Sequence, residues 1–152
     1  MKNLKVKIKL IEGGKLPEYK REGDVCLDCY ARLSEVETIY PSENGKIPLG
    51  FVLELPEGYE AVVRPRSGLS SKGIDVFIGT IDINYRGEVC AIVRNNSYTV
   101  SFIGVRGEPF IINNGDRICQ LAIRKAPHVE WELVDELSET NRGKNGFGSS
   151  GK

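Results

Sequence analysis

The sequence lacks several features that mark common classes of protein. Its 21 basic and 21 acidic residues cancel, so there is no excess charge of either sign. A balanced chain gives no reason to expect a protein that coats nucleic acid or an anionic membrane. The opening MKNLKVKIKL contains no unbroken apolar segment, and no stretch elsewhere approaches the apolar length of a membrane span. We therefore expect a cytoplasmic protein that binds neither nucleic acid nor membrane.

Metal-binding side chains are also scarce. His128 is the single histidine, and the four cysteines include one CxxC pair, Cys26 and Cys29. An extended chain points residues three apart to opposite faces, so this pair is poorly placed to share a metal ion. Because the sequence has no second CxxC, we expect free thiols rather than zinc ligands. A disulfide framework is not expected in a chain of this size without signs of export.

Long helical periodicity is missing as well, whereas short β-rich segments are frequent. Leu4, Val6, Ile8 and Leu10 alternate with lysines, which is typical of a half-buried strand. Further segments of this kind are separated by Gly, Pro, Asn and Asp: IPLGFVLEL, EAVVRP, GEVCAIVRN, YTVSFIGV, RICQLAIR and HVEWELVDEL. The most helix that we allow is one turn at SGLSSKG.

The length of 152 residues fits one domain with a proper core. The strand pattern predicts an all-β fold, a jelly-roll-like distorted β barrel, over residues 1–137. Residues 138–152 have almost no core-forming side chains, and we predict that they form a flexible C-terminal arm.

This arm ends in GFGSSGK, which matches most of the GxxxxGK phosphate loop. Such a loop needs a strand before it, a Ser or Thr after the Lys, and a helix whose N-terminal amides hold the anion. None of these accompanies the segment in the sequence. Either the match is due to chance, as in many Gly- and Ser-rich ends, or the segment binds phosphate in another arrangement.

Polar clusters interrupt the predicted strands. They are Asp28 in LDCYA, PRSGLSS at 65–71, GTIDINYRG at 79–87 and GDRICQL at 115–121, and the tail makes a fifth. Each is weak alone, because GDR is an ordinary turn and RSG can simply begin a turn of helix. Together, their order and spacing resemble the five motifs of the trimeric dUTPase (dUTP diphosphatase) family, from about Asp24 to Ser150. The resemblance implies a jelly-roll-like homotrimer in which each active site is shared among three chains.

The sequence departs from the family pattern in places. Cys26 and Cys29 flank Asp28, where the family usually has small residues including Gly. Thr80 stands where an aliphatic residue or Gly is common, and Asn84 where an acid often precedes the Tyr. The segment at 95–114 is longer than the usual connection, which predicts an extra hairpin.

The third cluster carries the chemistry that the resemblance implies. Asp82 would orient and deprotonate the water that attacks the α-phosphorus of dUTP, giving dUMP and pyrophosphate. The alternative from the residues alone is a turn-capping Asp, which is common in sequences like DIN. A straight strand would point Asp82 and Tyr85 to opposite faces, so we expect a sharp turn at Asn84. By resemblance, Gly79 and Ile81 belong to the hairpin that binds uracil, and the Tyr85 ring packs on the deoxyribose.

Four residues of the other motifs would bind the phosphates by resemblance: Arg66, Ser67, Gly68 and Gln120. The alternative for Arg66 is a structural ion pair, with Asp28 as its partner. Asp116 and Arg117 are expected to fix a turn. The cofactor implied is Mg²⁺, held mainly by triphosphate oxygens and water. In that arrangement Asp28 would contact the metal ion through water.

The arm acquires a role from the same resemblance. Arg142 would reach the terminal phosphate, and the ring of Phe147 would lie on the uracil. Gly148, Ser149 and Ser150 would close over the phosphates. Ordering a loose arm costs conformational entropy, so closure is expected only when substrate contacts offset that cost.

Other functions stay open at this point. A dCTP deaminase of the same fold would need a glutamate base, for which Glu88 is the nearby candidate. A regulatory protein that binds another protein in a nucleotide-dependent way would use residues 97–108, where Tyr98, Val100 and Phe102 alternate. For these three side chains we favour ordinary core or trimer packing over a partner surface. A catalytically inert jelly-roll module is the third possibility, and the number of separate polar motifs argues against it.

Overall fold

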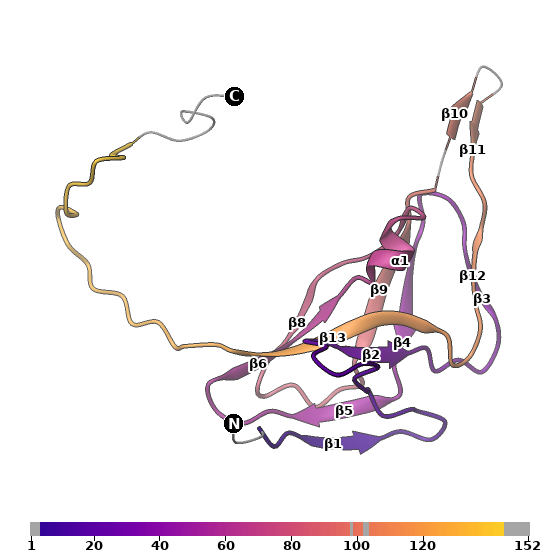
Figure 1. Cartoon of the computed structure of the whole chain (residues 1–152), viewed down its shortest axis with the longest axis horizontal. Helices are drawn as coiled ribbons and strands as arrows, with labels where there is room; N and C mark the ends of the chain where they lie inside the picture. Colours follow the sequence, from indigo (N-terminus) through magenta and orange to yellow (C-terminus); the bar gives the residue numbers. More distant parts are fainter. Residues whose placement is uncertain (1–3, 98, 102–103, 145–152) are drawn as a thin grey trace.

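The computed structural model describes residues 4–144 except for 98, 102 and 103. Regular structure in this part of the chain is almost entirely β, as predicted (Figure 1). The strands are β1 (Lys7–Leu10), β2 (Leu27–Tyr30), β3 (Glu37–Ile39), β4 (Asn44–Pro48), β5 (Phe51–Glu54), β6 (Tyr59–Arg64), β7 (Ile74–Val76), β8 (Gly79–Ile81), β9 (Cys90–Asn95), β10 (Thr99–Ser101), β11 (Gly104–Arg106), β12 (Phe110–Ile112) and β13 (Arg117–Lys125). The predicted turn of helix is α1 (Ser67–Ser70).

The described strands pair antiparallel throughout and form five sheets. The largest has the order β2-β13-β6-β8, the next is β4-β9-β7, and the others are the pairs β1-β5, β12-β3 and β10-β11. Among the described residues these sheets do not close into a continuous barrel. The four-stranded sheet matters most for the site, because β8 lies at one edge and β2 at the other.

The core lies where the apolar positions of these ladders face one another. In β9, Ala91 and Val93 are buried while Ile92 between them is exposed, which is the period of two expected of a strand. Phe51 and Leu49 are completely buried beside them in one apolar cluster. Each large side chain buried in this way stabilises the fold by roughly 1.5–3 kcal/mol.

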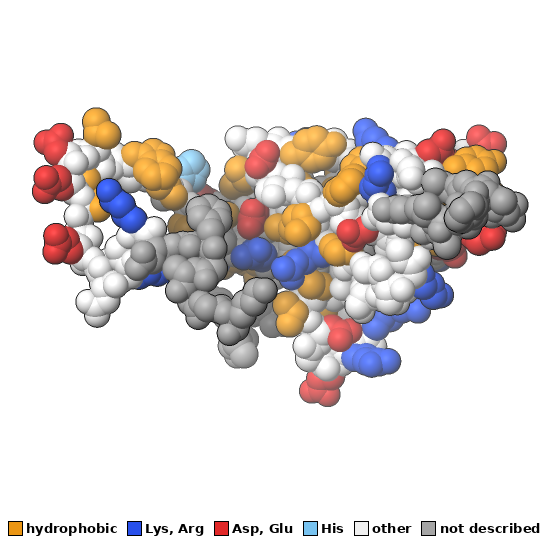
Figure 2. Space-filling model, turned by 90° about the horizontal axis from the view of Figure 1, so that it is seen from above, with side chains coloured by type: hydrophobic (Ala, Val, Ile, Leu, Met, Phe, Trp, Pro, Cys, Tyr) orange, Lys and Arg blue, Asp and Glu red, His pale blue; other side chains and the backbone are white. Residues whose placement is uncertain are grey.

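One predicted strand is absent from the described chain. HVEWELVDEL, residues 128–137, forms no strand, and beyond β13 the chain runs away from the body of the protein (Figure 1). Trp131 and Leu133 are 89% and 100% exposed, and Figure 2 shows apolar side chains standing clear in this region. An alternating pattern indicates that one face of a segment is buried in the native protein. It does not indicate whether the same chain or a neighbouring chain covers that face.

The predicted extra hairpin between the third and fourth motifs is confirmed. β10 pairs with β11, with Thr99 opposite Arg106, and Figure 1 shows the hairpin projecting from the fold. Its base is held by the buried Asn95, whose Nδ2 donates to the carbonyl oxygens of Ile39 and Glu108, both at 2.9 Å. The prediction for Val100 concerns a side chain that the structure does not describe, and Tyr98 and Phe102 lie outside the described residues. In the described part of the chain, no helix has the length and apolarity to cross a membrane.

Candidate functional site

The third motif forms one wall of a small cavity beside β8. The cavity has a volume of about 190 Å³ and brings together four predicted site residues, Gly79, Ile81, Asp82 and Tyr85. We call it the β8 pocket. Its remaining lining residues are Lys46, Val63, Thr80, Glu88, Val89 and Cys90.

The predicted turn is what brings Asp82 and Tyr85 together. The Tyr85 amide donates to the Asp82 carbonyl oxygen at 3.0 Å, closing a tight turn directly after β8. Arg86 then donates from Nη1 to the carbonyl oxygen of Ile83 at 2.6 Å. The predicted sharp turn at Asn84 is present and needs no positive φ there, since Ser42 is the one non-glycine residue with positive φ among those described. The convergence was predicted correctly, although the backbone achieves it by an ordinary turn.

The Tyr85 ring is fixed by its own hairpin. Its hydroxyl donates to the carbonyl oxygen of Glu88 at 3.1 Å. The ring lies so close to Gly87 that a Cβ there would collide with the phenol oxygen, so a side chain at this position would displace the ring. The ring is about half exposed, which leaves the rest of it available to a ligand.

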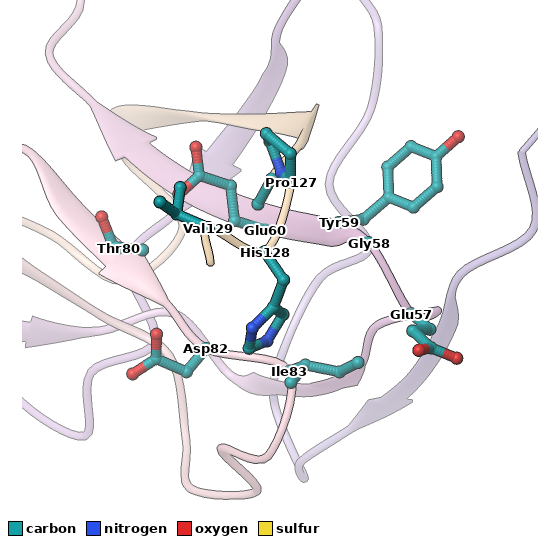
Figure 3. A pocket seen from close by; sticks show the side chains of 11 residues that line it. Glu57, Gly58, Tyr59, Glu60, Thr80, Asp82, Ile83, Pro127, His128 and Val129 are labelled. Carbon is teal, nitrogen blue, oxygen red and sulfur yellow. The ribbon is translucent and has the colours of Figure 1, made fainter. Parts of the chain in front are cut away.

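Asp82 and Thr80 also line a second, larger cavity. Its volume is about 530 Å³, and His128 and Glu60 are among its lining residues (Figure 3). Sequence reasoning assigned no role to these two side chains or to Lys46. Their proximity to Asp82 follows from how strands far apart in sequence are placed, which no local pattern reveals. Asp82 itself is exposed.

The second cluster of predicted residues surrounds Asp28. Its Oδ1 accepts a hydrogen bond from Gln120 Nε2 at 3.0 Å, and its Oδ2 lies 3.1 Å from Nη1 of Arg117. Arg66 Nε is 3.5 Å from Oδ1, so the predicted ion pair between Arg66 and Asp28 is confirmed. Gln120 meets Asp28 because the two are register partners in the β2–β13 ladder. We call this group the Asp28 cluster.

Asp28 is only 5% exposed, and a buried carboxylate is stable only when it is well paired. The Arg66 guanidinium is braced in turn, because its Nη1 donates to the carbonyl oxygen of Arg117 at 2.7 Å. Asp116 fixes the adjoining turn as expected, with its Oδ2 accepting from the Asn113 amide at 2.8 Å. Arg117 was expected to fix the same turn, but its guanidinium pairs with Asp28 instead.

Ser67 and Gly68 lie at the start of α1, next to Arg66, and both are exposed. A Cβ added to Gly68 would meet nothing within 4 Å, so the space beside it is open. Their predicted phosphate contacts stay predictions. Arg142 lies in the exposed segment beyond β13, and the described residues do not include Phe147, Gly148, Ser149 and Ser150.

In the described part of one chain, the β8 pocket and the Asp28 cluster lie apart. Neither cavity beside β8 is lined by a member of the Asp28 cluster. β2 and β8 are opposite edges of the four-stranded sheet. Three strand spacings separate them, which corresponds to about 14 Å.

Glu88 is held firmly at the rim of the β8 pocket. Arg32 binds it through two parallel hydrogen bonds, from Nε and Nη2, each 2.9 Å long. The Gly50 amide donates to the same carboxylate at 2.9 Å. The Arg32 guanidinium holds the pKa of Glu88 below its ordinary value, and the Gly50 amide acts in the same direction. A carboxylate held in this way is a weak base, which disfavours the deaminase alternative.

The four cysteines are free thiols. Cys29 and Cys119 are both completely buried and face each other in the β2–β13 ladder. A hydrogen bond with Cys119, together with burial, raises the pKa of the Cys29 thiol. The described residues contain no group of three or more His, Cys, Asp or Glu side chains that could hold a metal ion.

Comparison with known proteins gives a consistent family. The dUTPase family model matches residues 12–151. Deoxyuridine 5'-triphosphate nucleotidohydrolase of Orientia tsutsugamushi (strain Boryong) is 45% identical over 155 residues, covering 97% of this chain and 99% of the relative.

Two solved phage structures are also similar. The dUTPase of Staphylococcus bacteriophage 80alpha with dUPNHPP, described among phage dUTPases that control transfer of virulence genes, has a TM-score of 0.84 at 27% identity and covers 99% of this chain and 100% of its own. The dUTPase of phage phi11 of S. aureus, solved to visualise its species-specific insert, has a TM-score of 0.76 at 25% identity over 90% of this chain and 100% of its own. Together with the site geometry, these similarities show that the chain belongs to the dUTPase family.

Proposed function

We propose that this protein hydrolyses dUTP to dUMP and pyrophosphate. The observation that carries the proposal is the β8 pocket, in which a tight turn places the exposed Asp82 carboxylate beside the ring of Tyr85. The name of the Orientia relative and the dUPNHPP bound to the 80alpha enzyme agree with this substrate.

Asp82 is the catalytic residue in this proposal. Its carboxylate accepts a hydrogen bond from a water molecule and takes the proton as the water attacks the α-phosphorus. Its exposure leaves room for that water. Positioning and charge stabilisation do most of the work in phosphoryl chemistry, so one aligned carboxylate is a sufficient base.

The β8 pocket accounts for the choice of nucleoside. Backbone amide and carbonyl groups around Gly79 and Ile81 pair with the edge of uracil. Cytosine would place a donor against a donor, and each buried unpaired group costs roughly 1–3 kcal/mol. The Tyr85 ring packs on the deoxyribose, where a 2′-hydroxyl would clash with it.

The Asp28 cluster supplies the phosphate half of the site. One carboxylate faces the two guanidinium groups of Arg66 and Arg117, so the cluster carries an excess positive charge that attracts phosphate oxygens. Gln120 belongs to this cluster, and Ser67 and Gly68 follow its member Arg66 in the chain. Phosphate oxygens would compete with Asp28 for Gln120 and Arg66, which are hydrogen-bonded or paired within the chain.

Mg²⁺ enters this reaction as part of the substrate, bound to triphosphate oxygens and water. The described residues offer no cage for the ion, and cationic or amide groups already lie against both Asp28 oxygens. Asp28 is therefore a poor direct ligand, and its contact with Mg²⁺ through water remains part of the proposal.

We also propose a homotrimer with shared active sites. The β8 pocket and the Asp28 cluster are separate in one chain, so a complete site needs the pocket of one copy beside the cluster of another. Exposed apolar side chains along 128–137 give a second reason to expect burial against a neighbouring copy. The arm at 138–152 then closes over a neighbour's substrate through Arg142 and Phe147.

Product analysis tests the activity directly. Purified protein with Mg²⁺ is incubated separately with dUTP, dCTP, dTTP and UTP, while pyrophosphate, ammonia and nucleoside monophosphates are measured. We expect pyrophosphate and dUMP from dUTP alone. Ammonia from dCTP would replace the proposal with a deaminase, and no turnover of any nucleotide would reject it.

The β10–β11 hairpin supports regulation as a second function. It projects from the fold on a base fixed by the buried Asn95, and the similar phi11 dUTPase has a species-specific insert (Figure 1). We propose that residues 97–108 bind a regulatory protein partner. Excising 97–108 tests this: unchanged kinetics and assembly agree with a partner surface, whereas loss of the trimer would assign the hairpin to assembly.

A further inference from the structure

An ion pair outside the family motifs reaches the β8 pocket from a distant part of the chain. Arg32 follows β2, and Glu88 precedes β9, 56 positions later in the sequence. Their two parallel hydrogen bonds, each 2.9 Å, form a fork that fixes the orientation of the carboxylate as well as its position.

The surrounding backbone is shaped to hold this fork. Gly50 has a φ of +77°, and its amide donates to Glu88 at 2.9 Å. A Cβ on Gly50 would lie 2.9 Å from Cδ of Arg32 and would also collide with Gly14. A side chain at this position would therefore displace Arg32 from Glu88. The Arg32 amide donates to the Pro48 carbonyl oxygen at 2.8 Å, which anchors the other end of the same side chain.

Glu88 transmits this anchoring to the substrate pocket. Its carbonyl oxygen is the acceptor for the Tyr85 hydroxyl, at 3.1 Å. The next residue, Val89, accepts a backbone hydrogen bond from the Leu49 amide at 3.0 Å and donates one to the Phe51 carbonyl oxygen at 2.9 Å. The base of the hairpin after β8 is therefore fixed in two ways. The backbone of Val89 is hydrogen-bonded to Leu49 and Phe51, and the side chain of Glu88 is hydrogen-bonded to Arg32 and Gly50.

We propose that Arg32 and Glu88 are positioning residues that hold the Tyr85 ring and so set the discrimination between deoxyribose and ribose. This inference rests on the proposed function of the same pocket. Neither side chain needs to touch the substrate, because the fork acts through the carbonyl oxygen that Tyr85 binds.

A purely stabilising role explains the pair less well. The two side chains are 32% and 22% exposed, so water still screens the pair in part and reduces what it contributes to folding. Positioning is far more sensitive, since a displacement of about 1 Å can cost about a hundredfold in rate. Exclusion of a hydroxyl group depends on a similarly short distance.

The test compares kcat and KM for dUTP and UTP, each with Mg²⁺, in the full-length protein. Arg32→Gln and Glu88→Gln remove the fork, and Glu88→Gln keeps an acceptor for the Gly50 amide. We expect the ratio of kcat/KM for dUTP over UTP to fall about tenfold in both variants, with UTP gaining relative to dUTP. Arg32→Lys keeps the cation without the fork and should restore part of the ratio.

Lys7→Gln is the matched control, because it removes another ion pair, 2.6 Å from Lys7 Nζ to Glu54 Oε1, between β1 and β5. Its ratio should equal that of the wild type. Equal losses for both nucleotides in the fork variants, or an unchanged ratio, would overturn the proposal. Circular dichroism and thermal unfolding identify any variant that fails to fold. If Arg32→Gln does not fold, the comparison of Glu88→Gln with wild type decides the test.

Ligand binding separates this inference from the proposed activity. If the wild type does not hydrolyse dUTP, the activity fails, and calorimetric binding of dUMP and UMP then tests the fork. A preference of the wild type for dUMP that is lost in both glutamine variants supports the positioning role. A preference that survives in them, or no preference in the wild type, overturns it.

Discussion

The β8 pocket and the Asp28 cluster each contain a predicted aspartate, but the two carboxylates have opposite surroundings. Asp82 is exposed after a turn, whereas Asp28 is 5% exposed and faces Arg66, Arg117 and Gln120. An exposed carboxylate can bind and deprotonate water, while one held by cations serves to keep them in place. The difference teaches that an aspartate in a motif has its role set by its neighbours in the fold.

Asp82→Asn gives the largest expected effect and tests the first half of this comparison. The amide cannot accept the proton of the attacking water, so kcat should fall by about 10²–10⁴. Folding should be unaffected, because the side chain is exposed. Steady-state kinetics measure kcat, and thermal unfolding measures stability. Glu57→Gln, which changes a carboxylate lining the neighbouring cavity, is the control. Activity close to that of wild type would remove Asp82 from the mechanism.

Asp28→Asn should show the reverse, a loss of stability that accompanies any loss of activity. It leaves two arginines beside a neutral amide in a buried site, and breaking such a pair costs about 3 kcal/mol. Urea unfolding measures this cost. Arg117→Gln, at a side chain 44% exposed, should cost less. Equal stability of the Asp28→Asn variant and wild type would show that the cluster is not structural.

Deletion of residues 141–152 tests whether the β8 pocket and the Asp28 cluster also need the C-terminal arm for catalysis. The truncated protein should remain folded and trimeric, because the described core ends well before this segment. Turnover should fall by about a hundredfold, since the contacts that position the triphosphate are lost. Sedimentation and steady-state kinetics measure both. Full activity of the truncated protein would reject the arm as a lid.

The smallest expected effect is on the pH dependence of stability. Arg32 lowers the pKa of Glu88 in the folded state below its ordinary value of 4.5. The unfolded state therefore takes up a proton first as the pH falls. The stability that Glu88 contributes is complete above pH 4.5 and is lost as the pH falls through the lowered value. The difference in stability between wild type and Glu88→Gln should shrink across that range, and a constant difference would contradict the shift.

Much of the fold could be predicted from local sequence, because period-two patterns mark strands wherever the chain buries one face. The turn from Asp82 to Tyr85 was also predictable from local sequence, because Asn84 and Gly87 are residues that favour turns. The fork between Arg32 and Glu88 was not, because 56 positions separate the partners and only the sheet arrangement brings them together. Residues 128–137 show the converse: they have the pattern of a strand, yet form none in the described chain.

The exposed segment beyond β13 also gives the protein an internal optical probe. Trp131 is the single tryptophan of the sequence and is 89% exposed. Its emission therefore comes from one known position, without a label or a substitution. If copies bury this segment against one another, emission should shift to shorter wavelength as the concentration rises, so that assembly can be followed in real time.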